Sequence, residues 1–330
     1  MSENAGGVPP REPAGPPPPP PMAARPPAVN PWAPVSYGPP PRRRNGGVVG
    51  GVIALVVLVA TAGVMAVVPH ELSGHAIAVP NSVHRSDASP GDGASSSPHA
   101  VPALETNPIL ANGVKLGAVS CELPQLGDTG PELSAFYEAL TDCLEQAWHP
   151  ALDRADEPSV KVAVSVTLPK VSACGAAPSK DQAVAYYCGG DTTIYAPTDW
   201  MLSDAGQNRS RHLATIAHEY GHHVQSESGI LTAAADRMSS PDQDSPADLA
   251  LVRRIELQAN CFGALFIAAA EGRGSISRAT ANAAVADYGR ADDSDDHGSR
   301  AHQLSWAKAG FTGQNTASCN TWSAPADEVS

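Results

Sequence analysis

The hydrophobic pattern after residue 106 changes its period several times, and each change marks a predicted element. Between residues 131 and 153, large apolar side chains recur every three or four positions, which predicts an amphipathic helix. Between residues 160 and 168, valine and leucine alternate with small or polar residues, which predicts a half-buried strand. Further strands are predicted at 183–188 and 192–196, and further helices at 210–226, 246–270, 275–288 and 299–309. This order predicts the α+β class, mainly helical with a small sheet.

Residues 48–68 follow neither period, because they consist of Val, Ala, Leu, Ile, Gly and Met with one Thr. A helix of this length spans about 30 Å, the thickness of the hydrocarbon core of a bilayer. A buried soluble helix would normally show a polar face, and the apolar region of a cleaved signal peptide is shorter. We therefore predict a single transmembrane helix within residues 45–69. The three arginines at 42–44 place the N-terminus in the cytoplasm and the residues after 69 outside the cell membrane.

The segments around this predicted anchor differ in composition. Residues 1–44 hold sixteen of the 32 prolines, which predicts a disordered cytoplasmic tail. A docking tail for a Pro-binding partner is the alternative for this segment. Residues 70–105 are rich in Ser, Asp, Pro and Gly and are predicted to form a flexible linker. Residues 106–330 are long enough for one domain with its own core.

Charge and cysteine content narrow the class of protein. The net charge of −13 excludes a strongly basic nucleic-acid binder, so we expect no nucleic-acid partner. All six cysteines lie after the predicted anchor, which favours disulfides formed in an oxidising compartment. Many pairings are open; we propose Cys121–Cys143 and Cys174–Cys188, which close short loops. The third proposed pair, Cys261–Cys319, would tie the predicted helix 246–270 to the C-terminal segment.

The sharpest chemical signal is the pair His218 and His222, with Glu219 between them, inside predicted helix 210–226. Two histidines four residues apart lie on one face of a helix, so both imidazoles can reach one zinc ion. Glu219 is adjacent and can accept a proton from a water at the open coordination position. His223 points about 100° away on a helix, and we interpret it as a non-ligand on the outer face or behind the ligands.

A catalytic zinc needs a third protein ligand, and Glu256 is the candidate. It lies in the predicted helix 246–270, which is otherwise largely apolar. A carboxylate in such a position lies at the edge of the core or is paired, and a ligand role would satisfy it. An exposed salt bridge with Arg253 or Arg254 is the alternative.

Taken together, several segments resemble the bacterial neutral zinc metallopeptidase family. They are 187–195, 218–225, 256–262, 297–299 and 319–322, and the likeness covers roughly residues 107–325. The resemblance implies a zincin-like fold with His218, His222 and Glu256 as ligands of one catalytic Zn²⁺. This sequence departs from the family at Asn260, where an aspartate is common. Asn260 lies one turn after Glu256, so it either supports the ring of a ligand histidine or faces outward.

His297 follows an acidic run at 292–296. Leaning on the resemblance, we predict that it is catalytic and donates to the oxyanion formed during peptide hydrolysis. A solvated loop histidine is the alternative. The acidic run is interpreted as a solvated loop rather than a calcium site, because the spacing of a known calcium loop is missing.

The predicted function is a membrane-anchored, extracytoplasmic zinc peptidase that acts on a peptide or protein substrate, with Glu219 as general base. The first alternative is a catalytically silent binding or scaffold protein of the cell envelope, in which the metal only stabilises the fold. An intact Glu219 speaks against it, because a structural zinc has no use for a base. The second alternative is an assembly protein that works through its Pro-rich tail.

Overall fold

The computed structural model describes residues 103–239 and 245–330. The predicted tail at 1–44, the transmembrane helix within 45–69 and nearly all of the linker at 70–105 lie outside these residues. Leu104, placed at the end of the linker, is fully buried in the core, so the folded part includes it. Among the described residues, no helix combines the length and the apolar character that crossing a membrane requires.

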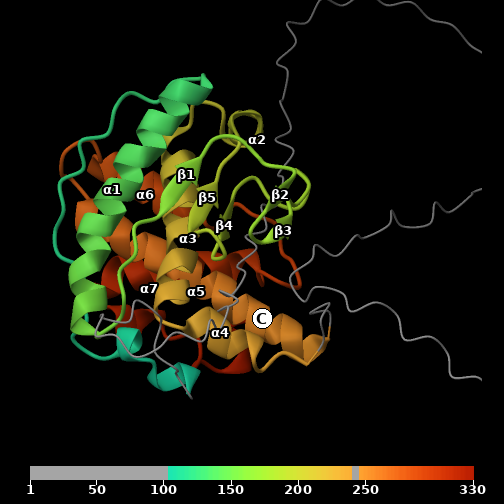
Figure 1. Cartoon of the computed structure of the whole chain (residues 1–330). Helices are drawn as coiled ribbons and strands as arrows, with labels where there is room; N and C mark the ends of the chain where they lie inside the picture. Colours follow the sequence, from blue (N-terminus) through green and yellow to red (C-terminus); the bar gives the residue numbers. More distant parts are fainter. Residues whose placement is uncertain (1–102, 240–244) are drawn as a thin grey trace, which may run out of the picture.

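The described part is helix-rich with a small sheet, and the α+β prediction is confirmed. The α-helices are α1 (Gly130–Arg154), α2 (Thr198–Ala205), α3 (Arg209–Glu227), α4 (Ile230–Ala235), α5 (Pro246–Ala270), α6 (Arg278–Asp287) and α7 (Arg300–Gly313). Short 3-10 helices occur at Leu104–Thr106, Pro108–Leu110, Thr316–Cys319 and Ala326–Glu328. Helix α3 lies inside the domain, packed against α1, α5, α6 and strand β4 (Tyr186–Cys188) (Figure 1).

The long helices follow from their hydrophobic spacing and their caps. The apolar positions that predicted the first helix are all buried in α1: Leu133, Phe136, Leu140, Cys143, Leu144 and Trp148. Helix α5 begins as predicted, with the Ser245 hydroxyl accepting a hydrogen bond from the Asp248 N–H at 3.1 Å. Helices α2 and α4 were not predicted, because each is too short to show a helical period.

The sheet has the strand order β1-β5-β4. Strand β1 (Ala163–Ser165) runs parallel to β5 (Thr193–Tyr195), and β4 runs antiparallel to β5 with Tyr187 opposite Ile194. A separate hairpin, which was not predicted, pairs β2 (Val171–Ser172) with β3 (Gly175–Ala176).

The predicted strand at 160–168 is wrong at both ends, since only β1 forms. At its start, side chains occupy the backbone groups that a sheet would need. The Val160 N–H donates to the Glu227 carboxylate at 3.1 Å, and the Val162 N–H donates to the Glu145 carboxylate at 3.1 Å. At its far end, the Ser165 hydroxyl donates to the Thr167 carbonyl at 2.8 Å and bends the chain away.

Helices α3 and α5 cross closely because two glycines lie at the crossing. A Cβ at Gly221 would lie 2.8 Å from the Ala259 carbonyl oxygen, and one at Gly263 would lie 3.0 Å from the Ala217 carbonyl. Real Cβ atoms do not approach so closely, so the crossing requires glycine. Gly221 lies between the two histidines of the motif, and this contact therefore sets how near α5 comes to them.

Three disulfides cross-link the domain, and they are the three proposed pairs: Cys121–Cys143, Cys174–Cys188 and Cys261–Cys319. The last disulfide joins α5 to the 3-10 helix Thr316–Cys319. It thereby holds the C-terminal segment against α5, which also carries Glu256.

Candidate metal centre

Helix α3 presents both histidines of the motif toward α5. The Nε2 atoms of His218 and His222 lie 3.1 Å apart. The His222 side chain is fully buried, whereas 12% of the His218 side chain is exposed. The two rings therefore converge on one point at the α3–α5 interface, as the four-residue spacing predicts.

Glu256 reaches the same point from α5. Its Oε2 atom lies 3.3 Å from His218 Nε2 and 3.4 Å from His222 Nε2. Glu256 is 2% exposed, so the alternative of an exposed salt bridge is excluded. Arg253 donates to the carbonyls of Val329 and Asp295, and Arg254 to those of Thr321 and Ala324.

These separations fit a tetrahedral zinc ion. Zinc bonds of about 2.0–2.1 Å place neighbouring ligand atoms about 3.3 Å apart, close to the three distances observed between the side chains. Among the described residues, His218, His222 and Glu256 form the one group of three or more such side chains whose ligand atoms converge, all within 4.8 Å. Burial alone would raise the pKa of Glu256, but the charges of His222 and His297 hold it well below its usual value. The carboxylate is therefore ionised, as a metal ligand must be.

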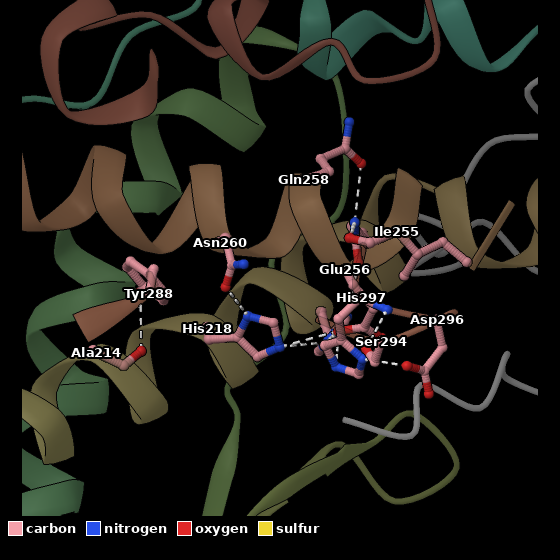
Figure 2. Close-up of polar contacts among 12 residues, drawn as sticks. Ala214, His218, Ile255, Glu256, Gln258, Asn260, Tyr288, Ser294, Asp296 and His297 are labelled. Atoms are coloured by element: carbon pink, nitrogen blue, oxygen red, sulfur yellow. Dashed lines mark hydrogen bonds and ion pairs between the residues drawn. The ribbon is translucent and has the colours of Figure 1, made fainter. Parts of the chain in front are cut away.

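Amide oxygens hold the outer nitrogens of both rings. His218 Nδ1 lies 2.8 Å from the Asn260 side-chain oxygen (Figure 2), so of the two options for Asn260 the side chain contacts this histidine and does not face outward. His222 Nδ1 lies 2.9 Å from the side-chain oxygen of Gln225. Gln225 was missed at the sequence level, although its position one turn after His222 placed it within reach.

Glu219 lies beside the ligands and is 3% exposed. Its Oε2 atom is buried and has no hydrogen-bond partner among the described residues. Burial raises the pKa of Glu219 to about 7, helped by the charge of Glu256 and opposed by His218. A buried carboxylate oxygen without a partner is uncommon and indicates a group that acts on something bound nearby.

His297 is also part of this cluster, so it is not a solvated loop residue. Its Nε2 lies 3.3 Å from Glu256 Oε2, and its Nδ1 lies 3.0 Å from Asp296 Oδ1 (Figure 2). Burial alone would lower the pKa of His297, but these two carboxylates raise it well above its usual value. The ring is thus a cationic donor at the edge of the site, and its role toward an oxyanion stays a prediction.

A cavity of about 90 Å³ opens next to His218, Glu219 and His297. It extends along α3 as far as Arg211, whose guanidinium pairs with Asp204 and with Asp287. A small molecule or a peptide side chain could therefore reach Glu219 and the converging ligand atoms from one side.

His223 does not belong to the site, in agreement with its interpretation as a non-ligand. It is fully buried rather than on an outer face. Its Nδ1 lies 3.1 Å from the Tyr187 hydroxyl and its Nε2 lies 2.9 Å from the Val160 carbonyl oxygen. Both ring nitrogens are therefore occupied by the protein.

The acidic run at 292–296 is tied to its neighbours. Asp293 accepts a hydrogen bond from the Arg300 N–H at 2.7 Å, and Asp292 pairs with the Arg300 guanidinium at 2.5 Å. Asp296 pairs with His297. These contacts describe a charged loop that is held by ion pairs and hydrogen bonds.

Comparison with known proteins identifies the class that the fold and the site define. Residues 127–322, more than half of the chain, match the family described as "Putative neutral zinc metallopeptidase", and the chain belongs to this family. The chain is 31% identical over 155 residues to the uncharacterized protein YpfJ of Escherichia coli K12, an alignment that covers 42% of this chain and 53% of the relative. It is 26% identical over 149 residues to the uncharacterized protein Rv2575 of Mycobacterium tuberculosis H37Rv, covering 42% of this chain and 46% of the relative.

The chain thus spans about half the length of the curated relatives that it matches. No solved structure matches it significantly.

Proposed function

We propose that this protein is a zinc peptidase that hydrolyses peptide bonds, with His218, His222 and Glu256 holding the ion and Glu219 acting as general base. The family membership supports a peptidase, and the converging ligand atoms support the zinc. The observation that carries the catalytic part is Glu219, a buried carboxylate with one unpartnered oxygen that lines a cavity beside the ligands.

The residues divide the chemistry between them. When bound, zinc supplies Lewis acidity, which favours deprotonation of water and polarises a carbonyl. The Glu219 carboxylate takes the proton of the attacking water and delivers it to the leaving amine. Burial raises the pKa of this carboxylate and so makes it a stronger base than an exposed one. His297 carries positive charge at the rim, where it would stabilise a developing oxyanion.

Glu219→Gln tests this proposal. The amide keeps the size of the side chain but cannot accept the proton, so peptide cleavage should fall by at least ~100-fold while zinc content stays at one ion per chain. Glu227→Gln is the matched control, because Glu227 is a buried glutamate on the same helix outside the site. Equal cleavage by wild type and Glu219→Gln would remove Glu219 from the mechanism.

The same assay separates the silent scaffold from the peptidase. Wild-type protein that binds zinc tightly but cleaves none of a diverse peptide library would favour a structural metal. The unpartnered oxygen of Glu219 speaks against that alternative, because a structural site is normally closed and fully satisfied.

We further propose that the peptidase domain lies outside the cytoplasm, anchored by residues 45–69. The three disulfides support this location, because disulfides persist in oxidising compartments. Protease added to intact cells should remove residues 70–330 and leave an epitope within residues 1–44 protected. An N-terminal epitope that is accessible from outside would overturn the orientation.

A further inference from the structure

Two glutamine side chains connect the ligand His222 to the C-terminal segment. Gln225 of α3 lies 2.9 Å from His222 Nδ1 through its oxygen, and its amide nitrogen donates to the Ile255 carbonyl at 2.8 Å and to the Gln258 oxygen at 3.0 Å. Gln258 of α5 donates to the Cys319 carbonyl at 3.0 Å, and its oxygen also accepts from the Trp322 indole N–H at 3.3 Å. Figure 2 draws a hydrogen bond at the Gln258 side-chain oxygen, which accepts from the Gln225 amide nitrogen.

The far end of this chain of hydrogen bonds has a fixed direction. An indole N–H can only donate, and a backbone carbonyl can only accept. Between Trp322 and Cys319, Gln258 therefore has one favourable orientation, with its oxygen toward the indole and its nitrogen toward the carbonyl. An inverted amide would set two donors against each other and two acceptors against each other.

This direction is passed on to His222. Because the Gln258 oxygen is an acceptor, the amide nitrogen of Gln225 must face it, and the Ile255 carbonyl requires the same orientation. The Gln225 oxygen is then the atom that faces His222 Nδ1, and it can only accept. His222 must carry its proton on Nδ1, which leaves the Nε2 lone pair directed at His218 and Glu256.

We propose that Gln225 and Gln258 are positioning residues that fix His222 in its metal-binding tautomer. Both are fully buried, so water does not compete for these contacts. Gln225 also joins His222 to the backbone one residue before Glu256, and it thereby holds two ligands at a set distance. The inference rests on the metal-binding part of the proposed function and on none of its catalytic part.

Zinc affinity of the full chain, measured by competition with a chromogenic chelator, tests the proposal. Gln225→Met and Gln258→Met keep the length of the side chain and remove its polarity. We expect a loss of roughly 10–100-fold for Gln225→Met and of roughly 10-fold for Gln258→Met, although Gln258 touches no ligand. Trp306→Phe is the control, because its indole also donates to a carbonyl, that of Glu328, outside this network, and it should bind zinc like wild type.

Wild-type affinity in folded Gln258→Met would overturn the proposal. A merely structural role would lower the melting temperature of the metal-free protein without weakening zinc binding by the folded form. Failure of the wild type itself to bind zinc would instead refute the proposed function, so the two failures are distinguishable.

A second measurement needs neither Gln225→Met nor Gln258→Met to fold. Histidine-selective ¹⁵N NMR of the metal-free full chain at pH 9, with the His222 signals assigned by their loss in His222→Gln, reports which nitrogen carries the proton. Protonation of Nδ1 is expected, and protonation of Nε2 would overturn the proposal.

Discussion

His222 and His223 are neighbours on helix α3 and both are fully buried, but their ring nitrogens have different partners. The protein occupies both nitrogens of His223, through the Tyr187 hydroxyl and the Val160 carbonyl. It occupies one nitrogen of His222, through Gln225, and directs the other at a second histidine and a carboxylate. Burial alone therefore does not distinguish a structural histidine from a ligand. The difference lies in the second ring nitrogen. In His223 it contacts a hydrogen-bonding group of the fold, and in His222 it faces other side chains that could bind a metal.

The two glutamates of α3 repeat this contrast. Glu227 accepts a hydrogen bond from the Val160 N–H, in the segment that precedes β1. Glu219, which lines the cavity with His218, keeps one oxygen without a partner among the described residues. Some buried polar groups of α3 thus have partners in the fold that hold neighbouring segments, and others keep atoms without such partners.

The largest expected effect comes from removing Glu256, one of the three proposed zinc ligands. Glu256→Ala leaves two histidines around an ion that prefers three protein ligands in catalytic sites, so zinc affinity should fall by more than ~100-fold. A chelator titration of the full chain measures this loss, with Glu227→Gln as the control that should bind normally. Tight binding by Glu256→Ala would overturn the ligand assignment.

His223→Leu should have the opposite pattern, because it should lower the stability of the fold and leave zinc affinity almost unchanged. It leaves the Val160 carbonyl and the Tyr187 hydroxyl without their partner, which should lower the free energy of unfolding by roughly 2–3 kcal/mol. Zinc affinity should stay within a few-fold of wild type. Chemical denaturation in the presence of a chelator, together with zinc titration, separates the two quantities. Loss of zinc without loss of stability would place His223 among the ligands.

The stability of the fold should also depend on pH through Glu227. Burial, and then the charge of Glu157, raises the pKa of Glu227 from 4.5 to about 7. Between these values the folded protein holds a proton that the unfolded chain has lost, so the stability should decrease as pH rises from 4.5 to 7 and then level off.

Glu227→Gln cannot ionise and should lack this decrease. It should therefore exceed the stability of wild type by roughly 1–2 kcal/mol at pH 8, after allowance for partial solvent screening, and match it near pH 4. Urea unfolding across this pH range is the measurement. Parallel curves for the two proteins would contradict the assignment to Glu227.

Asn260→Asp should give the smallest change. A carboxylate 2.8 Å from His218 Nδ1 would make that ring a stronger ligand than the neutral amide does, so zinc should bind a few-fold to ~10-fold more tightly with the fold intact. The same chelator competition measures it. Unchanged affinity would mean that the amide already orients the ring as well as a charge can.

The sequence predicted the long elements and the motif, because both depend on local spacing. Each of these features shows within one or two turns of helix: the hydrophobic period of α1, the cap at Ser245, and the four-residue spacing of His218 and His222. The strand at 160–168 failed because side chains distant in sequence, Glu227 and Glu145, occupy its backbone groups. No local pattern could have shown this.

The support of the site was only partly predictable. For Asn260, one helical turn after Glu256, the sequence left two options open, a contact with a candidate ligand histidine or an outward-facing side chain. Gln225 has the same turn-length relation to His222, but its role depends on Gln258 and on the close crossing of α3 and α5 at Gly221. Likewise, the local sequence left His297 open between a catalytic donor and a solvated loop histidine, and the fold brings its ring against Glu256. Contacts between helices decide these roles.

The link from His222 to Cys319 and Trp322 has a consequence for biosynthesis. Those two residues leave the ribosome after both ligand helices have been made, and the Cys261–Cys319 bond forms only once the chain meets an oxidant. A nascent or still-reduced chain would therefore have its histidines and glutamate without the partner that orients one of them. Under the proposed function, the site would therefore be completed only after the C-terminal segment has been made and its disulfide has formed.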